Sequence, residues 1–422
     1  MFFLKNKLNN KFIKNVITLM TGTTIAQAIP IIISPILTRL YTPTEFGLFS
    51  VYMSITTILA IFATARYELA IMLPKKNEES LAIVKLSMLI NISVSFILFL
   101  LVLFLKNQFN LFINESKIGN WIYVIPLSVF LLGLYNTFYY WSNRNQLYKV
   151  MMQNRIIQST SMSGTQLLFG FLKLNSIGLI LGYIFSQLTS TIRLFLKSKP
   201  PKKIKDNVNI ELIKKQAHKY NNFPKYLTFS HSTEALSANM PQILLTTYFG
   251  SKYAGFYALL LRVVGLPLSL IGKSVGDVFL QNASKRFAEQ GECKSLYLKT
   301  FKSLALLAII PFVILYMISV PLFSFVFGAE WAIAGEYMKI FIIPFYLQFI
   351  SSPLSHMFII AQKVKTELFT HIIITTLAFL SFYIGYNKFH SIEISLWMFS
   401  IVLTIKYAFF LAASYSFSKG KR

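Results

Sequence analysis

The sequence predicts an all-α polytopic membrane protein with about twelve transmembrane helices, in two pseudo-symmetric six-helix lobes around a central cavity. Of its 422 residues, 55% are hydrophobic and 13% are charged, whereas about a quarter are charged in soluble proteins. The apolar residues form runs of about 18 or more, the length that crosses a bilayer as a helix. These runs are continuous and lack the alternation of barrel strands, which argues against a β-barrel.

Twelve apolar stretches follow one another with short connections, and their ends are defined to within a few residues. We expect helical spans at roughly 14–38, 46–73, 80–105, 119–141, 149–172, 176–196, 224–249, 253–280, 301–327, 334–361, 366–386 and 392–415.

The net charge of +26 predicts topology rather than nucleic-acid binding, because cytoplasmic loops of membrane proteins collect Lys and Arg. With both termini in the cytoplasm, about 27 Lys and Arg residues fall in cytoplasmic segments and about 6 in external ones. The basic N-terminus has no cleavage site after a short apolar core, so we expect a retained first helix. Cys293 is the single cysteine, which excludes an intrachain disulfide. We therefore expect a multi-pass membrane protein with both termini in the cytoplasm.

The longest connection divides the chain into a lobe at 1–198, a basic cytoplasmic linker at 199–222 and a lobe at 223–422. Within the linker, apolar residues recur at helical spacing opposite lysines, which predicts an amphipathic helix on the anionic inner leaflet. A solvated charged loop is the alternative. The apolar positions are Ile210, Ile213, Ala217 and Tyr220.

The two lobes resemble each other weakly, since 26–52 aligns with 237–261. Pro30 then pairs with Pro241, and each lobe starts on the same side, which predicts a parallel repeat about an axis along the membrane normal. Each proline removes a helical hydrogen bond and allows a kink. We expect paired gating kinks, with static bends as the alternative.

The first, fifth and seventh spans carry more polar residues than a lipid-facing helix tolerates. Gln27 lies in the first, Arg155 and Gln158 in the fifth, and His231 and Glu234 in the seventh. We expect these helices to line a cavity, although helix–helix packing also accounts for the serines and threonines. The i, i+3 pair of the seventh span is a candidate ion-coupling site or a satisfied polar pair. The histidines show no ligand spacing, so no metal site is expected.

The stretch ARYELAIMLPKKNEES puts Arg66 and Glu68 inside the second span. In a continuous helix they would lie roughly 200° apart, so that each would need its own partner or a wet cavity. We expect Arg66 to face the cavity and Glu68 to pair with Arg155 or Arg262. In the repeat alignment Arg66 falls beside Lys273, with Asp277 one turn further on.

At these residues the sequence resembles a known group. The segments PILTRLYTPTEFGLFSVYMSI, ARYELAIMLPKKNEES and GSKYAGFYALLLRVVGLPLSLIG are similar to the polysaccharide-transporter branch of the multidrug/oligosaccharidyl-lipid/polysaccharide (MOP) exporter superfamily. This branch contains the Wzx-type flippases of O-antigen and capsule synthesis. The resemblance is strongest over about 20–80 and 223–285 and weak after 300, and it does not identify the sugar.

The resemblance implies a flippase that moves undecaprenyl-pyrophosphate-linked repeat units across the cytoplasmic membrane by alternating access, with no enzymatic activity and no cofactor. A pyrophosphate needs a cationic path, and an arginine fork binds phosphate with two hydrogen bonds. The expected partners are the lipid-linked oligosaccharide, membrane lipids and the polysaccharide polymerase machinery. The candidate cations are Arg66, Arg155, Arg193, Arg262 and Lys273.

Three alternatives stay open from the sequence. A cation-coupled multidrug or small-molecule exporter of the same fold would need an acidic, aromatic cavity, whereas the buried candidates are mostly basic. A membrane polymerase or ligase of the same pathway would need long external loops, and the external connections are about 15 residues or shorter. A flippase for a teichoic or teichuronic lipid-linked glycan is a close variant that the sequence does not exclude.

Overall fold

The computed structural model describes residues 2–113, 121–200 and 208–420, and within these ranges it is helical and contains no strand. Long helices occupy all twelve predicted positions. Ten of the helices in the described part are long and apolar enough to cross a membrane. The other two long helices, α6 and α10, are 24 and 22 residues long but too polar to meet that criterion. They are the fifth and seventh spans, whose polarity the sequence had marked. The prediction of a multi-pass helical membrane fold is confirmed.

The chain forms two compact units, Met1–Ala235 and Leu236–Arg422. The boundary falls inside α10 (Thr228–Phe249), so the contacts of α9 and of the first turns of α10 belong to the first unit. The lobes at 1–198 and 223–422 stay a prediction of the sequence.

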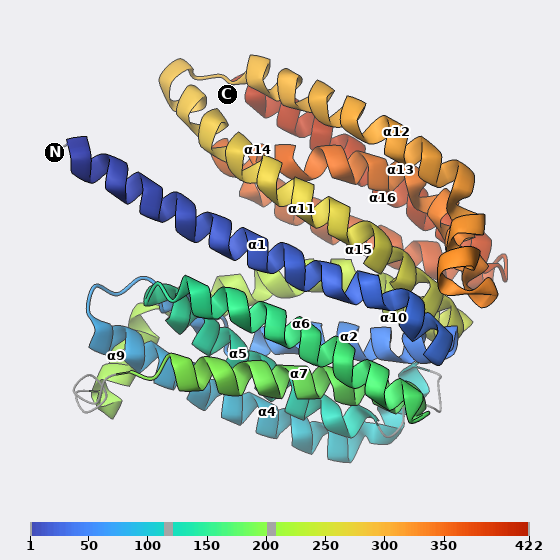
Figure 1. Ribbon diagram of the computed structural model, residues 1–422, viewed down its shortest axis with the longest axis horizontal. Coiled ribbons are helices and arrows are strands. Elements are labelled where there is room, and N and C mark those ends of the chain that lie inside the picture. The colour runs from blue at the N-terminus through green and yellow to red at the C-terminus, as the bar shows by residue number, and fades with distance from the viewer. Residues whose placement is uncertain (1, 114–120, 201–207, 421–422) are drawn as a thin grey trace. The chain divides into compact units, whose positions relative to one another are not determined.

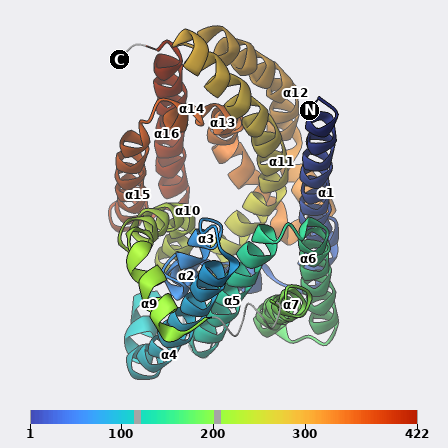
Figure 2. The ribbon, with the colours of Figure 1, turned by 90° about the vertical axis from the view of Figure 1, so that its left-hand side faces the viewer.

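Six long helices precede the linker in the first unit, and Figures 1 and 2 show α6 and α7 running side by side, with α1 along α6. Helix α2 begins with Thr42 as N-cap in a capping box with Glu45, followed by a proline in the first turn. The six helices are α1 (Phe2–Leu40), α2 (Pro43–Ala63), α4 (Asn77–Ile113), α5 (Ile125–Arg144), α6 (Tyr148–Phe171) and α7 (Asn175–Lys197). The short elements are α3 (Tyr67–Ala70), η2 (Trp121–Val124), α9 (Ile210–Lys219) and η3 (Phe223–Leu227).

The second predicted span is interrupted. Helix α2 ends at Ala63 and α3 begins at Tyr67, and between them Ala65 and Arg66 adopt left-handed backbone conformations with φ values of 47° and 60°. The sequence predicted one continuous helix here, because the segment contains neither glycine nor proline at the break. The reason for the break is tertiary, since the next turn is fixed by contacts with other elements.

The linker helix α9 packs on the protein beside α4 (Figure 2). Leu212, Ile213 and Tyr220 cover a buried cluster of α3, α4 and α5 side chains that includes Tyr67 and Trp141. Ile210, in contrast, is 72% exposed, and the lysines of α9 are exposed as well. Most of the apolar side of α9 therefore contacts protein, and the membrane-surface role of its exposed side stays a prediction.

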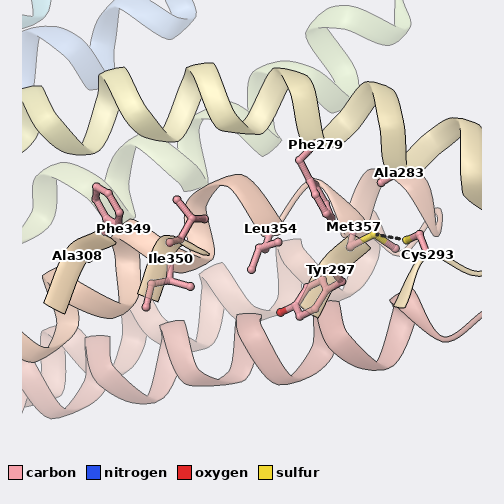
Figure 3. Close-up of a cluster of buried hydrophobic side chains, with 10 residues drawn as sticks. Phe279, Ala283, Cys293, Tyr297, Ala308, Phe349, Ile350, Leu354 and Met357 are labelled. Atoms are coloured by element: carbon pink, nitrogen blue, oxygen red, sulfur yellow. Dashed lines mark hydrogen bonds between the residues drawn. The ribbon is translucent and has the colours of Figure 1, made fainter. Parts of the chain in front are cut away.

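The second unit is built around α13, which packs against α11, α12 and α16. One buried cluster of this unit joins α11, α12 and α13 and includes Phe279, Tyr297 and Phe349 (Figure 3). The long helices are α11 (Ser251–Gln290), α12 (Lys294–Phe327), α13 (Ala332–Leu354), α15 (Val364–Asn387) and α16 (Ile392–Ser418), with short elements η4 (Ala329–Trp331) and α14 (Met357–Ile360).

Pro30 and Pro241 lie inside α1 and α10, the first long helix of each predicted lobe. The Ser34 hydroxyl donates to the carbonyl oxygen of Pro30 at 2.5 Å. The acceptor that Pro30 leaves without a helical donor is the Ala26 carbonyl oxygen one turn earlier, and it accepts from the Ser159 hydroxyl at 2.5 Å. A gating role for the two prolines stays a prediction.

Candidate functional site

A polar pocket of about 380 Å³, open rather than enclosed, is formed by α1, α5, α6 and α7 of the first unit. Gln27 comes from α1, Arg155 and Gln158 from α6, and Gln187 from α7. These helices can surround a pocket because α6 packs closely on both α1 and α7. The lining residues are Thr23, Ala26, Gln27, Tyr135, Arg155, Gln158, Ser159, Met162, Tyr183, Ser186 and Gln187.

Arg155 is held in the pocket wall by neutral groups. One guanidinium nitrogen, Nη1, donates to the Thr23 hydroxyl of α1, and Nη2 donates to the Tyr139 hydroxyl of α5 at 2.6 Å. The guanidinium carbon also lies 5.2 Å from the centroid of the Tyr139 ring, within the range of a cation–π contact. The tyrosine ring in turn stacks on Tyr135, with centroids 5.9 Å apart. Three helices thus fix the orientation of one cation.

The amide and hydroxyl groups of the pocket are arranged by contacts between its walls. Gln158 Nε2 donates to Gln187 Oε1 at 3.2 Å, linking α6 to α7. The Ser159 hydroxyl donates to the Ala26 carbonyl oxygen of α1 at 2.5 Å. Near this level α1 and α6 approach each other closely at Gly22. A Cβ atom at residue 22 would meet the Met152 side chain of α6, so the close approach depends on glycine at this position.

The chemistry of this lining is that of an anion and hydroxyl receptor. Among the lining residues that the structure describes, Arg155 carries the formal charge, and the remaining polar groups are amides, hydroxyls and phenols. Arginine binds carboxylates and phosphates through paired N–H donors. Glutamine, serine and tyrosine side chains can both donate to and accept from sugar hydroxyls.

Arg66 and Glu68 form a second cluster at the break between α2 and α3. Arg66 Nη1 lies 3.3 Å from Glu68 Oε1, and the Thr64 hydroxyl donates to Glu68 Oε2. A pairing of Glu68 with Arg262 of the second unit stays a prediction. The expectation that the Arg66 and Glu68 side chains do not face each other is wrong, and so is the expectation that Glu68 needs a separate partner such as Arg155. Both assumed a continuous helix, whereas the left-handed residues turn the chain so that the two charges meet.

His231 of α10 lies close enough to this cluster for the charges of Arg66, Glu234 and Glu68 to act on it. Its Nδ1 atom is buried, and within the described part of the chain it has no hydrogen-bond partner. Glu234 is exposed. His231 and Glu234, the candidate coupling residues, therefore lie near the Arg66–Glu68 pair and are not among the residues that line the pocket.

The other predicted cations lie elsewhere. Arg193 of α7 donates from Nη1 to the Val150 carbonyl oxygen at 3.2 Å and from Nη2 to Gln153 Oε1 at 2.8 Å, so it joins α7 to α6 beside the pocket. Arg262 and Asp277 belong to α11 of the second unit, where Arg262 is partly buried and Asp277 is exposed. The side chain of Lys273 lies outside the described residues.

Sequence reasoning missed the aromatic and α7 sides of the pocket. Tyr135 and Tyr139 lie on an apolar span, and their one sequence signal is the tyrosine-rich run YNTFYYW at 135–141. Ser186 and Gln187 lie on α7, which is apolar enough overall to cross a membrane. It also missed Arg144, which donates to the carbonyl oxygens of Ile71 and Met72 at 3.2 and 3.3 Å and so anchors the segment after α3.

Solved structures share this fold over nearly the whole chain. The lipid II flippase MurJ in an inward closed conformation matches with a TM-score of 0.72 and 15% identity, covering 94% of this chain and 87% of that one. The MATE multidrug transporter DinF-BH matches with a TM-score of 0.61 and 16% identity, covering 95% and 94%. The MATE transporter VcmN of Vibrio cholerae matches with a TM-score of 0.57 and 15% identity, covering 97% of both chains.

These identities establish the fold alone. An inward-facing MATE transporter described as a member of the MOP superfamily is also similar, with a TM-score of 0.59, 11% identity and coverage of 94% of this chain and 93% of that one. No curated protein matches the sequence. The model of a family described as "Polysaccharide biosynthesis protein" matches residues 36–335. That segment is more than half of the chain, which therefore belongs to the polysaccharide biosynthesis protein family.

Proposed function

We propose that this chain flips polyprenyl-pyrophosphate-linked oligosaccharide repeat units from the inner to the outer leaflet of a bacterial cytoplasmic membrane. The product would be a capsule or O-antigen type surface polysaccharide, and undecaprenol the lipid carrier. Three findings support this reading: membership of a polysaccharide biosynthesis family, ten apolar membrane-length helices in the described part, and a fold shared with a lipid II flippase. The similar solved structures are described as multidrug transporters and a lipid II flippase, and we propose no enzymatic role.

The single observation that carries the proposal is the environment of Arg155. Its guanidinium belongs to a pocket of amides, hydroxyls and tyrosines, and within the described residues no carboxylate pairs with it. A lipid-linked oligosaccharide combines an acidic headgroup with sugar hydroxyls. The first needs a cation and the second needs side chains that donate and accept hydrogen bonds, and this pocket offers both.

The same observation weighs against a drug or cation exporter on this fold. Such a protein needs a negative charge at its binding site to replace the water around its cargo. Glu68, the most buried acid of the first unit, is already held by Arg66 and Thr64. In the described lining of the pocket the fixed charge is positive, which favours an anionic cargo.

The test is made in the organism that carries the gene. Deletion should abolish the surface polysaccharide and cause lipid-linked repeat units to accumulate in the inner leaflet. Arg155→Ala should reduce surface polysaccharide by roughly tenfold or more, since a hydrogen bond to a charged group contributes about 1.5–3 kcal/mol. Arg155→Lys should restore part of it, because lysine keeps the charge but loses the fork.

The matched control is Arg286→Ala, which removes the same charge from an exposed position near the end of α11. All variants are compared at equal amounts of membrane protein. Normal surface polysaccharide in Arg155→Ala cells would remove the pocket from the transport path. Normal polysaccharide in the deletion strain would remove the proposed function itself.

A further inference from the structure

Basic residues gather at the linker end of α6 and α7, which run side by side (Figure 1). Arg193 lies in the last turns of α7, and Lys149 lies in the first turn of α6. Arg193 donates from Nη1 to the Val150 carbonyl oxygen at 3.2 Å and from Nη2 to Gln153 Oε1 at 2.8 Å. Lys149 is one helical turn before Gln153 and therefore shares its side of α6. The Arg193 guanidinium thus meets α6 on the side that carries Lys149.

Lys197 adds a third cation, one helical turn beyond Arg193 on α7, and both Lys149 and Lys197 are exposed. The ion pairs formed within the described residues involve none of the three. A positive-inside bias by itself spreads basic residues over the loops. Here the two hydrogen bonds of Arg193 fix cations from two helices along one seam. Lys149, Arg193 and Lys197 are called the α6–α7 basic cluster below.

The α6–α7 basic cluster lies on the side of α6 that faces away from the pocket. Lys149, Gln153 and Thr160 fall within about 40° of one another around the helix, and Lys149 and Thr160 are exposed. Arg155, which lines the pocket, is about 200° further round than Gln153. The cluster is therefore a separate feature of the first unit, and none of its three cations is among the pocket-lining residues.

An exposed apolar strip on α7 ends at this cluster. Ile192, Phe195 and Leu196 are 49%, 47% and 53% exposed, and α7 is long and apolar enough to cross a membrane. Such side chains contact lipid acyl chains, while long basic side chains near the end of a span extend toward the headgroups. The ammonium nitrogen of Lys199 lies 5.9 Å from the centroid of the Phe195 ring. Cations and apolar side chains thus adjoin on one surface, as the phosphate and the acyl chains do in a phospholipid.

We infer that the α6–α7 basic cluster binds the phosphate of an anionic phospholipid, such as phosphatidylglycerol, in the leaflet on the linker side of the membrane. The distribution of charge predicts that this side is cytoplasmic. Basic sites between the cytoplasmic ends of transmembrane helices typically bind anionic lipid headgroups. The exposed ammonium groups of Lys149 and Lys197 donate to the phosphate oxygens. Arg193 holds the two helices together beneath the phosphate, so the bound lipid bridges the same pair of helices.

The apolar strip favours a lipid over a soluble anion. Free phosphate gains the charge interaction alone, whereas a phospholipid also covers Ile192, Phe195 and Leu196 with its chains. A headgroup with net negative charge is favoured over a zwitterionic one, since the cations of the cluster have no acidic partner among the described residues. The inference does not depend on the proposed function, because it involves neither the pocket nor its cargo.

The experiment uses the purified full-length protein, exchanged into a neutral detergent until its native phospholipid is removed. Thermal unfolding is followed while phosphatidylglycerol is added to the micelles, with phosphatidylcholine of the same acyl chains in a parallel series. We expect phosphatidylglycerol to raise the unfolding midpoint by about 2–4 °C and then to saturate, because a ligand that binds the folded state stabilises it by mass action. Phosphatidylcholine, and inorganic phosphate at constant ionic strength, should leave the midpoint unchanged.

Variants locate the lipid. Lys149→Gln/Lys197→Gln removes two exposed charges of the cluster and should raise the phosphatidylglycerol concentration at half-maximal shift by roughly tenfold or more, since each lysine near an anionic lipid surface contributes about fivefold. The matched control Arg286→Gln/Lys294→Gln removes two exposed charges beside the α11–α12 connection of the second unit and should leave that concentration unchanged. Arg193→Gln should weaken binding as well. Because it also removes hydrogen bonds to α6, its shift is measured from its own lipid-free midpoint.

The outcomes separate a lipid site from general attraction to a basic protein. Equal weakening in the cluster variant and the control would overturn the site, as would an unchanged response in the cluster variant or no saturable shift in the unmodified protein. An equal rise with phosphatidylcholine would remove the phosphate from the inference, and an equal rise with inorganic phosphate would replace the lipid with a soluble anion. Failure of the surface polysaccharide assay overturns the proposed function and leaves this site standing, because lipid binding is measured without any cargo.

Discussion

The Arg66 guanidinium lies 3.3 Å from the Glu68 carboxylate although two residues separate them in sequence. The contact depends on Ala65 and Arg66, which leave the right-handed helix with φ values of 47° and 60°. Glu68 is 1% exposed, and its second oxygen accepts from the Thr64 hydroxyl. The Tyr67 hydroxyl donates to the Ala217 carbonyl oxygen of α9 at 2.9 Å. The break in the second span is thus fixed on one side by an ion pair and on the other by the linker helix.

A double-mutant cycle on this pair should show strong coupling. Arg66→Gln leaves the carboxylate of Glu68 buried without its cation, whereas Glu68→Gln leaves an arginine whose side chain is 20% exposed. We therefore expect Arg66→Gln to be the more destabilising, by about 3 kcal/mol against about 1–2 kcal/mol. The double variant should lose less stability than the two single losses combined, with a coupling of about 1–2 kcal/mol. Thermal unfolding of the purified proteins measures all three. Additive losses would show that the ion pair contributes nothing to the break.

Replacing Ala65 with glycine should stabilise the protein. The left-handed conformation at this position brings the Cβ atom close to the backbone, at a cost of roughly 1–2 kcal/mol that glycine does not incur. Ala65→Val should have the opposite effect, because a β-branched side chain fits this conformation least well. The unfolding midpoint checks both, with Ala63→Gly in the regular helix as a destabilising control. A lower midpoint for Ala65→Gly would contradict the strained backbone at this residue.

The positions of the long helices follow from the sequence because run length and polarity are local properties. The predicted span at 149–172 is α6 at Tyr148–Phe171, and that at 176–196 is α7 at Asn175–Lys197. The break after Ala63 was not predictable in this way. It contains no helix-breaking residue. Glu68 is bound by Thr64 and Arg66 within the break itself, and the contact that depends on tertiary structure is the hydrogen bond from the Tyr67 hydroxyl to the Ala217 carbonyl oxygen of α9.

The pocket was predictable in part, because the polarity of a span is a local property of the sequence. The polarity of two spans points to Gln27, Arg155 and Gln158, all of which line it. The sequence could not indicate that Arg155 meets Thr23, 132 positions away, or that Tyr139 supplies the second acceptor. Partners at that separation are decided by how α1, α5 and α6 pack, and a tyrosine on an apolar span gives no sign of its partner.

The close approach of α1 and α6 at Gly22 should be sensitive to a single methyl group. A Cβ atom at residue 22 would overlap the Met152 side chain and lie 3.1 Å from the Met152 Cα. Gly22→Ala should therefore cost about 1–3 kcal/mol by separating the helices. It should also weaken the hydrogen bond from Arg155 to Thr23, the next residue along α1. Unfolding midpoint and surface polysaccharide are the two measurements.

Met152→Ala provides the complementary change for this contact. The double variant Gly22→Ala/Met152→Ala should recover part of the lost stability, because the shortened side chain makes room for the added methyl group. Gly164→Ala, at an exposed glycine of α6 whose Cβ would meet nothing within 4 Å, is the control and should not destabilise. No recovery in the double variant would mean that the two helices do not meet at these residues.

The predicted topology rests on the distribution of charge and can be tested at two exposed lysines. Lys173 lies between α6 and α7 and is predicted to be external, whereas Lys215 of α9 is predicted to be cytoplasmic. In a Cys293→Ser background, a membrane-impermeant maleimide added to whole cells should label Lys173→Cys and not Lys215→Cys. Permeabilised cells should give label at both. Labelling of Lys215→Cys alone in whole cells would invert the topology and place the basic linker outside, against the positive-inside rule.

Cys293, between α11 and α12, should react with thiol reagents far more slowly than an ordinary cysteine, and its rate should rise further with pH. It is 2% exposed, and its sulfur donates to the Met357 sulfur at 3.5 Å (Figure 3). Burial, aided by the Glu292 charge, raises the pKa of the Cys293 thiol to about 11. The thiolate is the reactive form, so at pH 7 its fraction is roughly a hundredfold below that of an unperturbed cysteine.

Iodoacetamide alkylation of the native protein should therefore still accelerate between pH 9 and pH 10, whereas alkylation of an exposed Lys215→Cys thiol should level off at about pH 9. Far-UV circular dichroism at each pH excludes unfolding as the cause. A rate that levels off near pH 9 at both positions would show that Cys293 is not held in these apolar surroundings.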